Sequence, residues 1–169
     1  TTRADSLSDE VCKAMGEAGC KWVSLGVESG SNTVLKAMNK YETIEQQEKG
    51  IDLCMKHGIG VKAFMISGLP GETKETQQET LTWAKKVKAK YGDKFITDIY
   101  ALVPSPGAPV WDTPEQFGFE VFKNENWELY NQILQNDEPL FKHPNLTHQE
   151  IKDFVIQFKR EVGENTSTK

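Results

Sequence analysis

The sequence has 169 residues, of which 37% are hydrophobic and 27% charged, with a formal net charge of −5. That length suffices for one domain with a buried core, and the negative charge gives no general attraction to the phosphates of nucleic acids. No apolar stretch approaches the roughly 20 residues of a membrane-spanning helix, and no signal peptide opens the chain. We therefore expect a cytoplasmic protein that binds neither nucleic acids nor membranes.

The first expected elements are a strand end, a helix and a strand. Residues 1–5 are too few to classify but could end a strand. Ser6 and Asp9 have the pattern of a capping box, and the helix that follows has a glycine stop at Gly19. Residues 21–27 (KWVSLGV) predict a strand, followed by Glu28 and small residues.

Two helices and a second strand are expected next. A short helix begins at residues 31–32, and a longer one begins at the capping box of Thr43 and Gln46 and stops at Gly58. Residues 61–67 (VKAFMIS) form a nearly continuous apolar run, which predicts a strand buried on both faces. The sequence GLPG at 68–71 then predicts a tight turn, because proline fixes φ and glycine tolerates positive φ.

The next expected elements are a helix, a third strand and a proline-rich loop. The helix covers about residues 76–91, with Thr76 and Glu79 as its capping box. Residues 95–103 (FITDIYALV) predict a strand, although Asp98 interrupts the apolar run. The loop at 104–109 cannot join a sheet interior, because its prolines lack an N–H group.

The last third of the chain is less regular. Residues 110–144 are rich in aromatic side chains, including Trp127 and Tyr130. A final helix begins at the capping box of Thr147 and Glu150, and the tail after it is expected to be frayed.

The order of these elements predicts a parallel sheet. Strands alternate with helices in units typical of right-handed β/α connections. A complete eight-unit barrel needs about 250 residues, so only part of one fits in this chain. A small open sheet and a piece of a barrel both remain open, and exposed strand edges could allow self-association.

Parallel strands bring their carboxyl ends to one rim, where ligands bind in such folds. The polar and turn residues expected at this rim are Arg3, Asp5, Glu28, Ser29, residues 68–72 and residues 100–103. A carboxylate there can accept hydrogen bonds from ribose hydroxyls, and Lys40 could hold a carboxylate or phosphate. Structural alternatives stay open: Glu28 could cap a helix, Lys40 could complement a helix dipole, and Glu72 could be only a first-turn charge.

No arrangement typical of nucleophilic catalysis or metal binding is evident. The three histidines have no serine or cysteine at motif spacing, so we expect surface or structural roles for them. Cys12, Cys20 and Cys54 are separated by intervals that match no zinc, haem or iron-sulfur motif. We expect reduced, partly buried thiols.

The order of the motifs resembles the second half of the radical SAM core, and most closely the group that often carries an amino-terminal cobalamin-binding domain. The motifs that carry the resemblance are TRAD, WVSLGVESGSNTVLKAMNK, AFMISGLPGET, IYALVPSPGAPVWD and FKHPNLTHQEI. The resemblance implies an α/β fold that is part of a TIM-like (β/α)6 partial barrel. Residues 1–110 would form its second half, and residues 111–169 an aromatic-rich and helical extension.

The resemblance also implies a site for S-adenosylmethionine. Glu28, with Ser29 beside it, would meet the ribose hydroxyls, and Lys40 would meet the methionyl carboxylate. The other residues implied to contact the cofactor are Arg3, Phe64, Met65, Ile66, Gly68, Tyr100, Ala101 and Leu102.

One departure from the family pattern decides what the chain can do. Family members hold a four-iron, four-sulfur cluster through a CxxxCxxC motif, and this sequence contains neither that motif nor the glycine-rich motif that accompanies it. We therefore expect a carboxyl-terminal fragment that is inactive alone. Its partners would be the missing amino-terminal half of the barrel and a small-molecule substrate, with cobalamin in an upstream domain of the parent enzyme.

Two other hypotheses remain. The chain could be a stand-alone, non-catalytic binding or interaction module derived from such a core, or an unrelated small α/β domain whose turn binds phosphate. The residues do not distinguish methyl transfer, ring formation, methylthiolation and oxidative rearrangement.

Overall fold

The computed structural model describes residues 1–122, 128, 131 and 140–163. Its centre is a parallel sheet with the strand order β1-β2-β3. The strands are β1 (Trp22–Glu28), β2 (Gly60–Ser67) and β3 (Phe95–Ala101). Thr2 adds an isolated parallel bridge to Leu25 at the outer edge of β1. The predicted parallel sheet is therefore confirmed.

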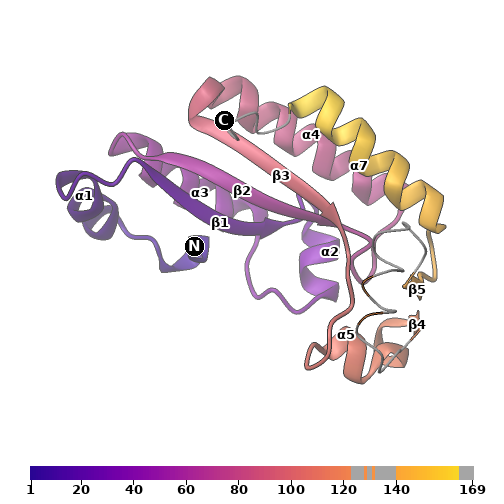
Figure 1. The fold of residues 1–169 in the computed structure, drawn as a ribbon. Coiled ribbons are helices and arrows are strands. Elements are labelled where there is room, and N and C mark those ends of the chain that lie inside the picture. Colours follow the sequence, from indigo (N-terminus) through magenta and orange to yellow (C-terminus); the bar gives the residue numbers. More distant parts are fainter. Residues whose placement is uncertain (123–127, 129–130, 132–139, 164–169) are drawn as a thin grey trace.

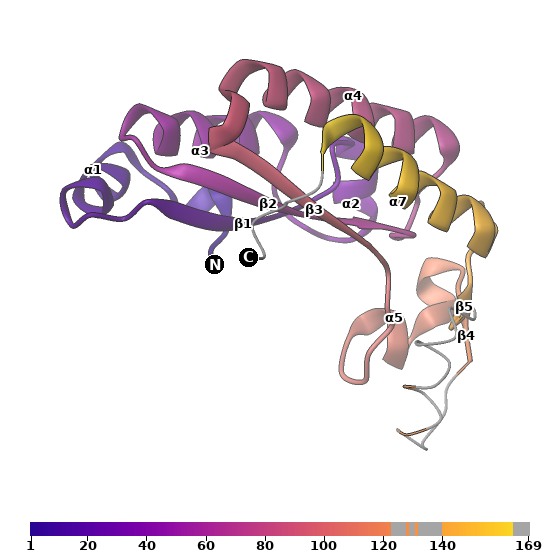
Figure 2. The same cartoon turned by 45° about the horizontal axis from the view of Figure 1, so that its top comes forward.

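The helices that cover the sheet lie on one side of it. The α-helices before the irregular region are α1 (Asp9–Glu17), α2 (Asn32–Ala37), α3 (Ile44–Lys56) and α4 (Lys74–Tyr91), and α7 (His148–Val162) follows that region. Figure 2 shows α3, α4 and α7 on the same side of the sheet, and Figure 1 looks onto the opposite face. We call this opposite face the open face.

Burial along the strands follows this one-sided cover. On the helix side, Leu25, Val61, Ala63, Met65 and Phe95 are fully buried and form the main core. Alternate residues of each strand face the other way and are partly exposed. The prediction that residues 61–67 are buried on both faces is thus wrong, because the described helices cover only one face of β2.

The capping signals in the sequence identify the starts of the helices correctly, with two exceptions. The capping boxes at Thr43 and Thr147 are confirmed. Helix α1 is capped by Ser8 rather than Ser6, because Ser6 belongs to a 3₁₀ turn, η1 (Ala4–Ser6). Helix α4 begins earlier than predicted, because Thr73 and Thr76 form the capping box and Thr76 lies inside the first turn.

Strand β3 is shorter than predicted. It ends at Ala101, which pairs with Ser67, the last residue of β2. The backbone N–H of the next residue, Leu102, donates to the Ser67 carbonyl at 2.7 Å. A 3₁₀ turn, η2 (Gly92–Lys94), connects α4 to this strand. No helix in the described part of the chain is long and apolar enough to cross a membrane.

The region after β3 builds a second, smaller core beside the strand ends. Its elements are α5 (Pro109–Asp112), η3 (Pro114–Phe117) and the antiparallel pair β4 (Glu120–Val121) and β5 (Phe141–Lys142). Phe119, Phe141 and Ile151 are among the residues that form this core. Trp127, Tyr130 and residues 164–169, the subjects of two predictions, lie outside the described residues.

Candidate functional site

Glu28 lies at the carboxyl end of β1 in an unusual backbone conformation. The register between β1 and β2 shifts between Gly26 and Glu28, and Glu28 has a φ of 67°. A left-handed backbone costs a residue with a Cβ atom about 1–2 kcal/mol, and such strain clusters at functional sites. The bulge turns the Glu28 carboxylate toward the end of α2, where Lys40 meets it.

The end of helix α2 places Lys40. Asn39 has a φ of 58°, its N–H donates to the Lys36 carbonyl, and the N–H of Lys40 donates to the Leu35 carbonyl at 2.9 Å. These are the two hydrogen bonds of a Schellman motif. The Lys40 ammonium then donates to the Gly26 carbonyl at 2.6 Å and to Glu28 Oε1 at 3.2 Å.

Gly26 leaves the room that this ion pair occupies. A Cβ atom at Gly26 would lie 2.5 Å from Glu28 Oε1 and 3.4 Å from Lys40 Nζ. Because the first distance is far below van der Waals contact, any side chain at Gly26 would displace the Glu28 carboxylate. The bare backbone beside Glu28 is therefore a requirement of this geometry.

Three further charged residues complete the group. The Arg3 guanidinium donates two hydrogen bonds to Asp5, at 3.0 and 2.7 Å, and a third to the Lys40 carbonyl at 3.2 Å. The Asp5 N–H donates to Glu42 Oε1 at 3.0 Å. The Arg3 hydrogen bonds hold the pKa of the Asp5 carboxyl below its usual range. We call Arg3, Asp5, Glu28, Lys40 and Glu42 the rim cluster.

The turn after β2 is organised by a buried carboxylate. Glu72 Oε2 accepts hydrogen bonds from the Gly68 N–H at 2.5 Å and from Ser67 Oγ at 3.0 Å, and Gln77 Nε2 lies 3.4 Å away. Glu72 is 1% exposed, and this burial raises the pKa of its carboxyl to about 7, although the three donors oppose the rise. The turn is held from inside by a group that titrates near neutrality.

The region after β5 holds the same turn from outside. His143 Nε2 donates to the Leu69 carbonyl at 3.0 Å, and Asn145 Nδ2 donates to the Glu72 carbonyl at 3.1 Å. His143 Nδ1 accepts the N–H groups of Asn145 and Leu146, which makes this ring a neutral, Nε2-protonated imidazole. Burial accordingly lowers the pKa of His143. The structural role predicted for this histidine is confirmed.

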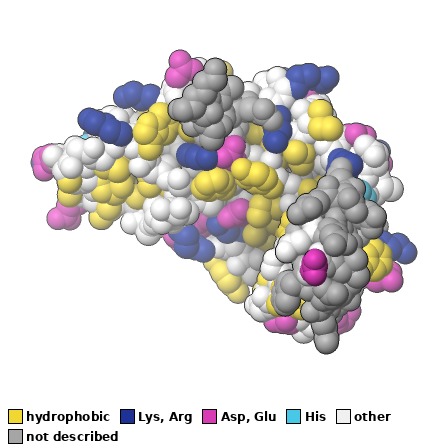
Figure 3. Space-filling model, viewed as in Figure 1, with side chains coloured by type: hydrophobic (Ala, Val, Ile, Leu, Met, Phe, Trp, Pro, Cys, Tyr) yellow, Lys and Arg dark blue, Asp and Glu magenta, His cyan; other side chains and the backbone are white. Residues whose placement is uncertain are grey.

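The structure brings some of the predicted cofactor residues together. Arg3, Glu28 and Lys40 meet in the rim cluster. Phe64, Ile66 and Tyr100 are partly exposed or exposed residues of the open face. Figure 3, which views that face, shows hydrophobic side chains interspersed with acidic and basic ones. The Lys62 ammonium on β2 lies 2.5 Å from the Asp98 carboxylate on β3, and this ion pair explains the aspartate in the apolar run of β3.

Other predicted residues point elsewhere. Met65 is fully buried on the helix side. Ser29 is also fully buried, and its hydroxyl lies 3.0 Å from Thr80 Oγ1 on α4. Gly68 is enclosed, since a Cβ atom there would lie 3.1 to 3.2 Å from Ile151 and Phe141. The side chains of Met65 and Ser29 therefore stabilise packing, and their predicted cofactor contacts stay predictions.

Ala101 and Leu102 follow Tyr100 at the end of β3 and are partly exposed. Leu102 packs beside the turn, with its Cβ atom 3.5 Å from the position that a Gly68 Cβ would take. These two residues thus lie next to the turn that Glu72 organises, and their predicted proximity to adenine stays a prediction.

Sequence reasoning did not predict the burial of two carboxylates, Glu42 and Glu72. Glu72 was a candidate first-turn charge, but the cap at Thr73 places it before the helix, and that cap is the signal that could have identified it. Glu42 precedes the Thr43 cap and has no periodic neighbour that would mark it as buried. Its burial depends on Arg3 and Asp5, which are distant in the sequence.

The residues present do not fit an iron-sulfur cluster. Within the described ranges, no group of three or more His, Cys, Asp or Glu side chains could hold a metal ion. Cys12 and Cys54 are buried with their sulfur atoms 4.0 Å apart, and burial raises the pKa of the Cys54 thiol to about 12. Thiols of this kind are poor sources of the thiolate ligands that a cluster requires.

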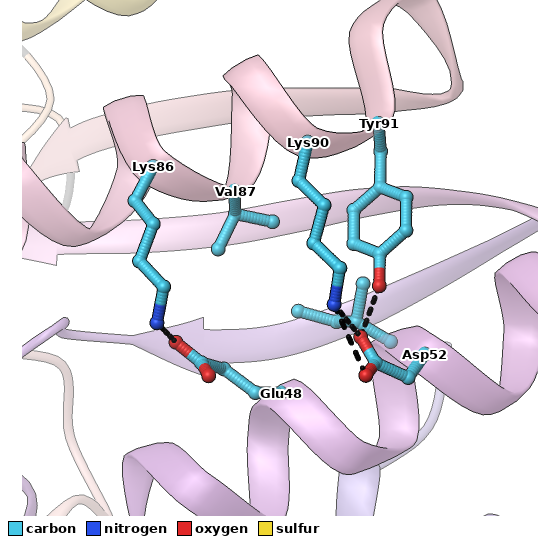
Figure 4. Close-up of a pocket in the computed structure, with 7 residues that line it drawn as sticks. Glu48, Asp52, Lys86, Val87, Lys90 and Tyr91 are labelled. Carbon is cyan, nitrogen blue, oxygen red and sulfur yellow. Dashed lines mark hydrogen bonds and ion pairs between the residues drawn. The ribbon is translucent and has the colours of Figure 1, made fainter.

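A small cavity between α3 and α4 is a packing feature. Its volume of about 20 Å³ is enough for roughly one water molecule. Figure 4 shows Lys86, Lys90 and Tyr91 of α4 reaching toward Glu48 and Asp52 of α3. Lys86 lies 2.8 Å from Glu48 and Lys90 lies 2.9 Å from Asp52. These charges pair across the helix interface, away from the rim cluster.

Comparison with known proteins identifies the family. Residues 1–84 match the Radical SAM superfamily. The chain is 28% identical over 155 residues to an uncharacterized methyltransferase of Pyrococcus horikoshii, covering 92% of this chain and 31% of that protein. It is 32% identical over 114 residues to the tRNA-2-methylthio-N(6)-dimethylallyladenosine synthase of Psychrobacter arcticus, covering 66% of this chain and 22% of that protein.

Solved structures share the fold. Elp3 from Methanocaldococcus infernus, with an N-terminal deletion, matches with a TM-score of 0.59 and 21% identity over 93% of this chain and 30% of that chain. The radical S-adenosylmethionine methyltransferase TsrM from Kitasatospora setae matches with a TM-score of 0.57 and 22% identity over 73% of this chain and 25% of that chain. The chain thus spans less than a third of the length of each of these four proteins. The solved structures show the fold, and residues 1–84, which include β1 and β2, match the family, so this chain belongs to the radical SAM superfamily.

Proposed function

We propose that this chain forms the carboxyl-terminal half of a radical SAM barrel and supplies the side of the S-adenosylmethionine site that holds the adenosyl group and the methionyl carboxylate. The observation that carries this proposal is the pairing of Glu28 with Lys40 at the carboxyl end of a parallel strand, beside the open face. In the proposal, residues 1–110 form the half barrel and residues 111–169 form an extension that holds the turn after β2.

The one-sided helix cover supports a barrel segment. A doubly wound sheet has helices on both faces, whereas a barrel has helices only outside and side chains that fill its interior. The open face would then be the interior of the complete barrel. Phe64, Ile66 and Tyr100 on that face would contact the adenosyl group, and Ala101 and Leu102 would lie near adenine.

The rim cluster provides groups that suit this cofactor. Glu28 is a hydrogen-bond acceptor for the two ribose hydroxyls, and Lys40 is a cation for the methionyl carboxylate. When both are bound, S-adenosylmethionine and a reduced iron-sulfur cluster would supply one-electron chemistry. The cluster ligands would come from outside these 169 residues, since CxxxCxxC is missing from them.

If this chain is only half of the barrel, the parent enzyme would need further parts. The partner of this chain would be the amino-terminal half of the barrel, and cobalamin would occupy a further domain of the parent enzyme. The chain alone would be inactive, and the edges of its outer strands, β1 and β3, could allow self-association. One relative is named a methyltransferase and another a tRNA-2-methylthio-N(6)-dimethylallyladenosine synthase, and we propose transfer of a methyl or methylthio group. We propose a small molecule as the substrate, because the negative net charge gives no general attraction to nucleic acids.

Calorimetry and NMR titration with S-adenosylmethionine test the binding part of the proposal. We expect the wild-type chain to bind and Glu28→Ala to bind at least about tenfold more weakly, as loss of hydrogen bonds to a charged group predicts. Glu48→Ala is the matched control, because Glu48 pairs with Lys86 across the helix interface. Absence of binding by the wild-type chain, or equal binding by Glu28→Ala, would contradict the proposal.

Two other results separate the alternatives. Competition in which phosphosugars outperform adenosyl ligands would favour a phosphate-binding turn. The coding sequence before Thr1 tests the cluster part, since an open reading frame long enough for half a barrel without CxxxCxxC would point to a non-catalytic binding module.

A further inference from the structure

Glu42 is a buried carboxylate with one oxygen that lacks a hydrogen-bond donor. Its side chain is 0% exposed. Oε1 accepts the Asp5 N–H at 3.0 Å, whereas no donor in the described part of the chain reaches Oε2. A buried, ionised oxygen without a donor is unfavourable. Such a group calls for an explanation, and its neighbours supply one.

Lys40 is the cation that faces this oxygen. Its Nζ lies 3.7 Å from Glu42 Oε2, which is within ion-pair range but beyond a hydrogen bond. The same ammonium donates to the Gly26 carbonyl and to Glu28. Lys40 therefore lies between two carboxylates, bonded to Glu28 and close to Glu42.

This position creates a conflict for ligand binding at Glu28. A carboxylate that accepts a hydrogen bond from Lys40 has fewer lone pairs and less charge available for ribose hydroxyls. The rim cluster contains three carboxylates and only two cations, Arg3 and Lys40.

We propose that Glu42 is a positioning residue that takes over Lys40 when Glu28 turns to a ribose. This inference rests on the proposed function. The Lys40 ammonium keeps its hydrogen bond to the Gly26 carbonyl and redirects a second N–H from Glu28 Oε1 to Glu42 Oε2. Its third N–H remains available to the ligand carboxylate. The transfer satisfies the unpaired oxygen of Glu42 and releases Glu28. No covalent bond changes and no proton leaves the ammonium.

The role makes a prediction that a purely structural role does not make. Without the Glu42 charge, the Lys40 ammonium keeps its hydrogen bond to Glu28. The chain then loses affinity only for ligands that need the Glu28 carboxylate. A nucleoside without the 2′-hydroxyl donates fewer hydrogen bonds to Glu28, so its affinity should fall less. The preference for ribose over 2′-deoxyribose is therefore the quantity that Glu42 controls.

The experiment compares 5′-methylthioadenosine with its 2′-deoxy analogue by NMR titration of the full chain, which detects weak binding. We expect the wild-type chain to prefer the ribose ligand by about tenfold, the size of a hydrogen bond to a charged group. Glu42→Gln should lower this preference at least threefold while leaving the affinity for the deoxy analogue within twofold. Glu48→Gln, which makes the same charge change on α3, should leave both affinities unchanged.

The outcomes distinguish this inference from the proposed function. If the wild-type chain binds neither nucleoside, both fail. If it binds with a ribose preference that Glu42→Gln leaves intact, or if both ligands weaken equally, only the inference fails. Should Glu42→Gln not fold, Glu42→Asp keeps the charge but retracts it by one methylene, and it must lower the ribose preference. An unchanged preference in that variant overturns the inference.

Discussion

The buried carboxyl of Glu72 predicts a pH dependence of stability that one substitution should remove. Its pKa in the folded chain is about 7, compared with an ordinary value of 4.5. Because the folded state binds this proton more tightly than the unfolded state, the contribution of Glu72 to stability is fully present below pH 4.5 and is lost as the pH rises through 7. The substitution Glu72→Gln leaves no proton to lose at this position.

The magnitude follows from the two pKa values. A difference of one pKa unit corresponds to about 1.4 kcal/mol, and most of the difference between 4.5 and about 7 takes effect between roughly pH 5 and 8. Glu72 alone should therefore lower the free energy of unfolding by about 2 to 3 kcal/mol over that pH range. The amide oxygen that Glu72→Gln introduces can still accept from the Gly68 N–H, which retains the turn. The difference in unfolding free energy between Glu72→Gln and the wild type should therefore grow by that amount over the same range.

Urea denaturation at several pH values measures this difference. Glu79→Gln, which changes an exposed glutamate on α4, is the matched control and should leave the shape of the wild-type curve unchanged. A difference that is constant with pH would refute the reasoning. It would mean that the donors at Ser67, Gly68 and Gln77 offset burial and keep Glu72 ionised throughout.

Three other substitutions test separate parts of the structure. Gly26→Ala should lower the affinity for adenosyl ligands at least about tenfold in NMR titrations, because the added Cβ lies 2.5 Å from Glu28 Oε1; unchanged affinity would exclude Glu28 from the site. Gly30→Ala should lower the free energy of unfolding by about 1–3 kcal/mol, since its Cβ would lie 2.8 Å from the backbone of α4, and a neutral effect in urea would disprove the close packing. Thr147→Ala should cost about 1 kcal/mol in the same assay through loss of the α7 cap, with Thr147→Ser as the control that retains it.

Local signals in the sequence were sufficient for the elements but not for the site. The capping boxes at Thr43 and Thr147 involve residues three positions apart, so they could be identified without knowledge of the fold. The helix start at Thr76 was wrong because Thr73 with Thr76 and Thr76 with Glu79 both have the spacing of a capping box, and only the turn geometry selects Thr73. The parallel order followed from the alternation of strands and helices, which is also a local property.

The burial of the two missed carboxylates depends on long-range contacts. Glu72 is enclosed partly by Asn145, which is 73 positions away, and Glu42 by Asp5, which is 37 positions away. A pattern of hydrophobic residues in one strand or helix contains no information on such contacts. The same limit applies to Asp98, whose charge is explained only by Lys62 on the neighbouring strand.

The turn after β2 and the rim cluster are mechanically connected through α2. A Cβ atom at Gly71 would lie 2.7 Å from the Cβ atom of Ala37, so the turn packs directly on the last residue of that helix. The Schellman motif that follows Ala37 fixes Lys40, and Lys40 holds Glu28. Glu72 accepts a hydrogen bond from the Gly68 N–H in this turn, so packed and hydrogen-bonded residues run without a break from Glu72 to the ion pair at β1.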